Sequence, residues 1–143
     1  MNLVLIVHAF SCWFMAGAIW LVQVLVYPNF RLVSQTEFQT FHKFHMERIT
    51  WVVAPLMGLE LISGIWLAIH YQSSLFIGNF VSVLALWGLT GLVNVPSHET
   101  LRFEVETTKT KLIRNNWPRT ILWTMRSIFL VWMIHLSIEG VLK

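Results

Sequence analysis

The sequence predicts an all-α fold, a four-helix transmembrane bundle with both termini outward and two cytoplasmic connections. Hydrophobic residues make up 56% of the 143 residues, charged residues only 12%, and no aspartate occurs. The mean hydropathy is +0.64, a balance that a soluble domain of this size does not need. Four apolar stretches fill most of the chain, so we expect one integral membrane domain over residues 1–143.

The four helices are expected at about residues 3–26, 36–70, 75–95 and 119–140, since a membrane span takes about 20 mostly apolar residues. The first stretch lacks a basic segment before it and a small-residue cleavage site, so we expect it to stay as a helix rather than be removed as a signal peptide. The Tyr27-Pro28 pair predicts its end, because the residue before proline is disfavoured in a helix.

Capping and proline signals define the other three helices. Ser34 and Glu37 have the spacing of a capping box at the start of the second helix, in which Pro55 predicts a kink. A tight turn is expected at residues 72–74. Pro96 predicts the end of the third helix, and Pro118 suits the first turn of the fourth. Between them, residues 98–116 are expected to form a cytoplasmic helical excursion.

Basic residues predict the orientation. The two long connections carry eight of the ten Lys and Arg residues, and the C-terminus carries one. These eight are Arg31, Lys43, Arg48, Arg102, Lys109, Lys111, Arg114 and Arg119. Because basic residues concentrate in cytoplasmic loops, both long connections are expected in the cytoplasm. The net charge of +3 gives no nucleic-acid signal beyond attraction to lipid headgroups.

Two charged residues fall inside apolar helices. Glu60 is expected near the bilayer midplane, and Arg126 lies inside the fourth helix. Intramembrane charges are costly, so they face the bundle interior and are paired or functional. A buried ion pair that holds the helices in register and a catalytic role, as a proton relay or a substrate anchor, both remain open.

His42 and His45 stand at the cytoplasmic mouth of the second helix. Their three-residue spacing puts them on one helix face, and His98 follows the third helix on the same side of the membrane. Glu60 lies 18 residues beyond His42, roughly 27 Å along the axis, too far to share a metal. Other polar residues expected at similar depth are Tyr27, Arg48, Asn94, Glu99 and Arg119.

The three histidines His42, His45 and His98 predict a metal site for iron, zinc or copper, because neutral imidazoles from two helices are a common ligand set in bundles. Three protein ligands would leave a coordination position open for chemistry. The chain has a single cysteine, Cys12, which excludes a cysteine-based metal site. The alternative is that these histidines hydrogen-bond headgroups or loop carbonyls, since short histidine motifs are common by chance.

His8 and His135 suggest a second interpretation, axial ligands of a haem b. Both lie about equally deep from the outer side, one on the first helix and one on the fourth. However, His135 is nine residues from Arg126 and therefore on the opposite helix face. One of the two residues must face lipid or a partner, and interfacial histidines without a cofactor are the alternative.

Sequence motifs along nearly the whole chain carry a family resemblance. They are Trp13-Phe14-Met15-Ala16-Gly17, Val22-Gln23-Val24 with Tyr27-Pro28, Phe41-His42-Lys43-Phe44-His45, Arg48 to Pro55 with Glu60, Val95-Pro96-Ser97-His98, and Asn116-Trp117-Pro118-Arg119-Thr120 with Trp123 and Arg126. The chain resembles a widespread family of uncharacterised small four-helix bacterial membrane proteins. More distantly, it is similar to the anthrone-oxygenase-like membrane proteins.

The resemblance supplies no reaction, but it implies a multi-pass protein of the bacterial cytoplasmic (inner) membrane. It also implies which residues belong to the family pattern: His42, His45, Glu60, His98, Arg119 and Arg126.

Three function classes remain open from the sequence. The first is a metal-dependent oxidoreductase acting on a lipophilic substrate from the bilayer, with Glu60 as proton donor or acceptor and Arg119 or Arg126 holding an anionic group. The second is a non-enzymatic membrane subunit or assembly factor whose polar residues only hold the bundle together. The third, transport, would require a homo-oligomer, because the chain has no internal repeat.

Overall fold

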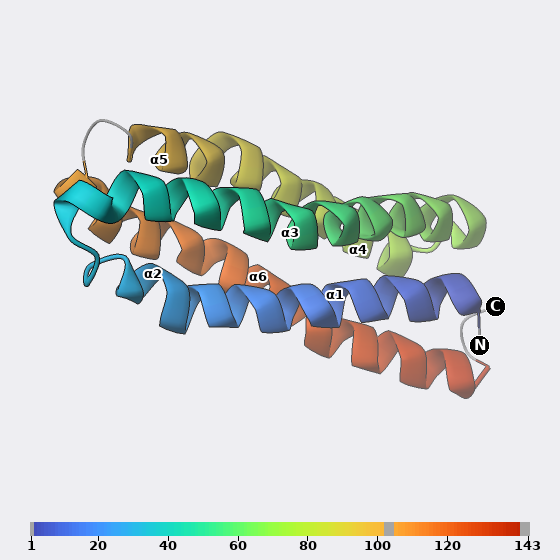
Figure 1. The fold of residues 1–143 in the computed structure, drawn as a ribbon. Helices are drawn as coiled ribbons and strands as arrows, with labels where there is room; N and C mark the ends of the chain where they lie inside the picture. The colour runs from blue at the N-terminus through green and yellow to red at the C-terminus, as the bar shows by residue number, and fades with distance from the viewer. Residues whose placement is uncertain (1, 102–104, 141–143) are drawn as a thin grey trace.

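The chain forms four long helical rods in the computed structural model, which describes residues 2–101 and 105–140 (Figure 1). The first rod joins α1 (Leu3–Leu21), the π-helical segment η1 (Val22–Val26) and α2 (Tyr27–Asn29); the second is α3 (Gln35–Tyr71); the third joins α4 (Ser74–Leu89), the π-helical segment η2 (Thr90–Asn94) and α5 (Val95–Thr100); the fourth is α6 (Val105–Ile138). The described residues contain no strand, so the predicted all-α class is confirmed.

All four rods are long and apolar enough to cross a membrane. Helix α1 begins and α6 ends at one end of the bundle, whereas the α2–α3 connection and the neighbouring ends of α5 and α6 lie at the other (Figure 1). The two long connections therefore share an end, as the basic residues predict. Which end faces the cytoplasm stays a prediction. Two of the basic residues on which this prediction rests, Arg102 and Lys143, lie outside the described residues.

Pro28 and Pro96 belong to the last turns of the first and third rods and do not end them. The predicted helix ends at Tyr27-Pro28 and at Pro96 are both wrong, because the first rod continues to Asn29 and the third to Thr100. In each case a π-helical segment comes directly before the residue that precedes proline. A π-helical turn is wider than an α-helical turn, and this is the physical reason why the helices continue past the prolines.

In both π-helical segments a backbone hydrogen bond spans five residues instead of four. The N–H of Tyr27 donates to the carbonyl of Val22, and the N–H of Val95 donates to the carbonyl of Thr90. Proline has no N–H, and its ring clashes with the carbonyl four residues earlier in a regular helix. A local π turn relieves that conflict inside a membrane helix.

The fourth rod also differs from its predicted bounds. A start near residue 119 with Pro118 in the first turn was expected, but α6 already includes Val105 and continues through Pro118 in its interior. The polar residues before Pro118 extend the helix beyond the apolar stretch. The predicted excursion is therefore helical in part and continuous with the last span.

The predicted start of α3 after Ser34 and the tight turn at its end are confirmed, whereas the predicted kink at Pro55 stays a prediction. The helix begins after Ser34, although the Ser34 hydroxyl donates to the Glu37 carboxylate at 3.1 Å and makes no bond to the backbone. Pro55 lies inside the helix. At its end Gln72 takes a left-handed conformation with φ of 47°, and its N–H donates to the carbonyl of Ala68, which closes the predicted tight turn before α4.

Two buried apolar clusters lie along the bundle. The larger cluster joins α1, α3, α4 and α6 around Trp123, and the smaller one gathers Phe30, Phe38 and Tyr27 at the end with the long connections. Helix α1 approaches α3 closely at Gly64, where an added Cβ would lie 3.3 Å from Cε1 of His8. A small residue is needed at that contact.

Candidate functional site

His42 and His98 lie in direct contact at the end of the bundle that carries the long connections. Nε2 of His42 is 2.9 Å from Nδ1 of His98, and the two rings stack at 15° with centroids 5.2 Å apart. Nε2 of His98 is in turn 2.9 Å from the Tyr27 hydroxyl. All three side chains are buried. They form a hydrogen-bonded chain that links α3, α5 and α2.

His45 lies beside this chain but has a different environment. Its ring packs 5.3 Å from the ring of Phe30, 6.3 Å from that of Tyr27 and 6.5 Å from that of His98. It is half-buried, and no hydrogen bond of its ring nitrogens is found among the described residues. Its donor and acceptor capacity is therefore available to another molecule.

The structure brings the three predicted metal ligands together but does not aim them at one point. Nδ1 of His98 faces His42 and its Nε2 faces Tyr27, so both nitrogens of this ring are engaged in hydrogen bonds. Among the described residues, no group of three or more His, Cys, Asp or Glu side chains has a metal-holding arrangement. The residues as arranged do not fit a three-histidine centre, and the predicted ligation by His42, His45 and His98 stays a prediction. The side chain of Glu99 lies outside the described residues.

A lateral cavity of about 330 Å³ begins at the histidines and extends into the bundle. Its wall is mainly apolar and includes Met15, Ile19, Ile49, Val53, Met57 and Trp87. Its polar lining includes Tyr27, His45, Asn94, His98 and Arg119. Trp87 is 41% exposed and Val95 is 45% exposed, and both line the cavity, which therefore reaches the outer surface of the bundle.

The two π-helical segments help to shape this cavity. Val22 of η1 lines it, as do Thr90, Gly91 and Asn94 of η2. Gly91 leaves open space, since an added Cβ would meet no atom within 4 Å. The turns that accommodate the prolines therefore also form part of the cavity wall, as is common for π segments at functional sites.

Arg119 is the buried cation of the lateral cavity. Its side chain is 6% exposed, and its guanidinium carbon lies 5.3 Å from the ring of Trp123. Nη1 donates to the Asn116 carboxamide at 3.3 Å and, with the Asn94 oxygen oriented toward it, to Asn94 at 2.9 Å. Nε has no hydrogen-bond partner. Among the side chains described, no carboxylate forms an ion pair with Arg119.

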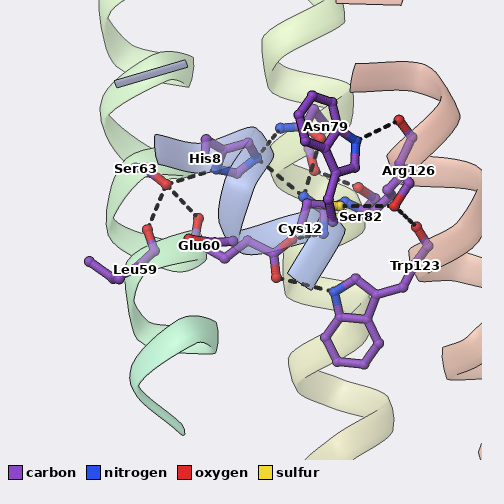
Figure 2. A network of polar contacts seen from close by, with 12 residues as sticks. His8, Cys12, Leu59, Glu60, Ser63, Asn79, Ser82, Trp123 and Arg126 are labelled. Carbon is purple, nitrogen blue, oxygen red and sulfur yellow. Dashed lines mark hydrogen bonds and ion pairs between the residues drawn. The ribbon is translucent and has the colours of Figure 1, made fainter. Parts of the chain in front are cut away.

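Deeper in the bundle, Glu60 and Arg126 form the ion pair that the sequence predicts as one alternative (Figure 2). Trp123 donates its indole N–H to the second carboxylate oxygen of Glu60 at 3.3 Å. Nη2 of Arg126 lies 3.2 Å from Nε2 of His8 and 3.3 Å from Oδ1 of Asn79. These residues come from α1, α3, α4 and α6, so this deep network joins all four rods.

The two residues predicted as haem ligands lie in different surroundings. His8 is buried in the deep network, with Nδ1 2.8 Å from the Ser63 hydroxyl and Nε2 2.8 Å from the Asn79 amide nitrogen. The His135 side chain is 63% exposed and pairs at 3.2 Å with Glu139, which directly follows the end of α6. Both nitrogens of His8 are engaged, and the two rings do not face one another. They therefore do not fit a bis-histidine haem b site within this chain.

Several residues of these two sites were not identified from the sequence. Asn79 was not singled out, Ser63 was not assigned a polar contact, and His8 was considered only as a haem ligand. Gln23 was not assigned a contact, although its amide oxygen accepts from Asn116 at 2.9 Å. The sequence signal that could have identified these residues is their polarity, because polar side chains inside apolar spans need hydrogen-bond partners.

Comparison with known proteins adds no assignment: no protein family, no curated protein and no solved structure matches this chain.

Proposed function

We propose that this chain is a multi-pass membrane protein that takes a lipophilic small molecule from the bilayer into the lateral cavity. The molecule's polar group would lie beside His45, His98 and Arg119. The observation that carries this proposal is the cavity itself, which combines a long apolar wall with polar side chains from several helices. That combination is typical of small-molecule sites.

The position and size of the cavity support a ligand that arrives through the membrane. Trp87 and Val95 belong both to its wall and to the lipid-facing surface. A volume of about 330 Å³ is near the lower end for ligand pockets. It therefore favours a molecule with one chain or one ring system over a two-chain phospholipid.

The histidines give this cavity groups that exchange protons. Tyr27 and His98 line the cavity, and His42 continues the hydrogen-bonded chain behind them. Imidazole is the side chain best suited to proton transfer near neutral pH. We propose His45 as the group that meets the ligand, and the chain of His42, His98 and Tyr27 as the route by which a proton is supplied or removed.

Metal-dependent redox chemistry on the same molecule is not favoured by the hydrogen bonds of His98. A metal ion at His42, His45 and His98 would supply Lewis-acid or electron-transfer chemistry when bound. His98 would first have to release His42 or Tyr27. We therefore propose ligand binding and proton transfer in preference to metal-dependent redox chemistry. The Tyr27→Phe variant described in the Discussion tests whether the three histidines bind a metal ion.

A diazirine photo-crosslinking experiment in lipid nanodiscs tests the binding proposal. The probes are hexadecanoic acid and hexadecanol, each with a diazirine in the chain. We expect saturable labelling by at least one probe within residues 45–57 or 87–95, the two segments that contribute most of the cavity lining. Phenylalanine at Gly91 should fill open space in the cavity and remove most of this labelling.

Gly88 provides the matched control. It lies one turn before Gly91, has equally open space around an added Cβ, and does not line the cavity. Gly88→Phe should keep the labelling. Labelling that is non-saturable, or that Gly91→Phe and Gly88→Phe reduce equally, would mean that the probes only contact the outer surface, and the proposal would be rejected.

A purely structural role is the second candidate, and the deep network favours it for part of the molecule. The ion pair of Glu60 and Arg126, with His8 and Asn79 in contact with Arg126, joins the four rods. We propose that these residues are structural, and that Arg119 alone of the three predicted catalytic residues serves the cavity.

We further propose the bacterial cytoplasmic membrane as the location of the protein.

A further inference from the structure

The two buried arginines differ in how their charge is balanced. Arg126 has the Glu60 carboxylate beside it. Arg119 is almost as buried, at 6% exposure against 3%, yet no carboxylate pairs with it among the side chains described. A buried charge is costly unless it is paired. Among the described side chains, Arg119 therefore lacks a counter-charge of the kind that Arg126 has.

The neutral partners of Arg119 use one edge of its guanidinium only. Nη1 meets the Asn116 and Asn94 carboxamides, and the face of the group lies over Trp123. Nε has no partner, and no hydrogen bond of Nη2 is found among the described residues. The edge formed by Nε and Nη2 is the one that binds a carboxylate or phosphate with two parallel hydrogen bonds.

This uncommitted edge belongs to a residue that lines the lateral cavity. His45, which also lines the cavity, has no hydrogen bond of its own among the described residues. An arginine edge and an imidazole N–H are both donors, whereas an alcohol or an amine offers little to neutralise the guanidinium. The missing partner at this end of the cavity is therefore an acceptor that carries negative charge.

We propose that the ligand of the lateral cavity is an amphiphile with a single negatively charged headgroup, held by Arg119 and His45, with its apolar chain along α3 and η2. This inference rests on the proposed binding function and names its ligand class. A long-chain carboxylate fits the cavity volume, and a lipid headgroup phosphate reaching in from the bilayer would offer the same chemistry.

The test compares the acid and alcohol photo-probes in nanodiscs of phosphatidylcholine, which carries no net charge. A charge-assisted hydrogen bond contributes about 1.5 to 3 kcal/mol. The acid should therefore label the wild-type protein at a concentration at least roughly tenfold lower than the alcohol needs. This ratio needs no variant. Equal labelling by the two probes would overturn the anionic assignment.

Variants then locate the charge. Arg119→Gln should remove the preference for the acid, and Arg119→Lys should keep part of it, because lysine retains the charge but not the two-bond edge. Arg114→Gln, an exposed arginine on the same helix, is the matched control and should leave the preference unchanged. An acid preference that survives in a folded Arg119→Gln protein would also overturn the proposal.

Adding phosphatidylglycerol to the nanodiscs distinguishes the two sources of the anion. Competition with the acid in wild type but not in Arg119→Gln supports a headgroup phosphate, and no competition supports a free carboxylate. Failure of the binding proposal has a different signature. In that case neither probe would give labelling that depends on Gly91, whereas an overturned anion assignment leaves Gly91-dependent labelling by both probes.

Discussion

Individual polar residues in this protein have two kinds of surroundings. Those of the deep network are joined by an ion pair and hydrogen bonds among Glu60, Arg126 and His8, although Nε of Arg126 has no hydrogen-bond partner (Figure 2). Those at the lateral cavity keep unused capacity, as Arg119 and His45 do. A charge-balanced network stabilises a fold, whereas a buried cation without a carboxylate beside it indicates a missing partner.

Removing one partner of the deep ion pair should destabilise the bundle. Glu60→Gln leaves the buried charge of Arg126 uncompensated, so we expect a loss of about 3 to 5 kcal/mol in the free energy of unfolding. The double variant Glu60→Gln/Arg126→Gln should lose less than the sum of the two single variants. Denaturant titration in detergent micelles measures this coupling.

The exposed pair of Lys43 and Glu47 provides the control, since Glu47→Gln should change stability little. Wild-type stability of Glu60→Gln, together with a lost ligand-dependent signal, would mean that Glu60 has a functional role and not a structural one.

Tyr27→Phe tests the hydrogen-bonded histidine chain and the metal prediction together. The change leaves Nε2 of the buried His98 without its partner at 2.9 Å, so we expect a cost of about 1 kcal/mol and a lower melting temperature. Tyr71→Phe, which removes a weaker, part-buried bond to Asn2, is the control.

The same proteins are then melted with added zinc. We expect zinc to leave both melting temperatures unchanged, since His98 still faces His42. A zinc-dependent rise, larger in Tyr27→Phe than in wild type, would instead support ligation by the three histidines.

At the scale of residues, the sequence predicted the pairing of Glu60 with Arg126 as one alternative, because two opposite charges inside apolar spans are costly unless they neutralise one another. It did not predict that His8 would join them. Helical periodicity tells which residues share a face of one helix, but not which neighbouring helix that face meets. For the same reason, the stacking of His98 on His42, with Tyr27 behind it, could not be derived from spacing.

At the scale of helices, the main difference from expectation lies at the prolines. Pro28 and Pro96 were expected to end helices, and they lie instead after the π-helical segments η1 and η2. The residue before proline usually avoids the helical conformation, which predicts that the helix ends there, but a wider π turn also avoids the clash of the proline ring. Contacts with neighbouring helices decide whether the helix ends or continues, and a local sequence motif does not contain them.

The contact between α1 and α3 should respond sharply to one added methyl group. A Cβ at Gly64 would lie 3.3 Å from His8 and 3.4 Å from Phe80. His8 is held by Ser63, Asn79 and Arg126 and cannot move freely. We expect Gly64→Ala to cost about 1 to 3 kcal/mol, measured by unfolding in detergent.

Gly58 on the same helix is the matched position, because a Cβ there would meet nothing within 4 Å. Gly58→Ala should be neutral or stabilise the helix by up to about 1 kcal/mol. If both substitutions had the same effect, close packing at His8 would not be what holds α1 on α3.

At the scale of the whole molecule, hydropathy was sufficient to predict the class and number of helices, because each span must satisfy its backbone internally. The lateral cavity was beyond such prediction. It depends on how the rods pack against one another, because its wall combines side chains from separate rods.

Orientation across the membrane follows from the basic residues and can be tested with cysteine labelling. In a Cys12→Ala background, Ser74→Cys probes the turn between α3 and α4, and Lys111→Cys probes the opposite end. We expect an impermeant maleimide added to intact bacteria to label Ser74→Cys only. Labelling of Lys111→Cys alone would reverse the predicted orientation.

Native mass spectrometry of the protein released from its own membranes tests the binding of a ligand in the lateral cavity most directly. We expect wild type and Gly88→Phe to carry one small lipophilic molecule per chain, and Gly91→Phe to carry none, because its side chain would occupy the cavity. A wild-type protein without any such molecule, or equal occupancy in all three proteins, would contradict the proposed function.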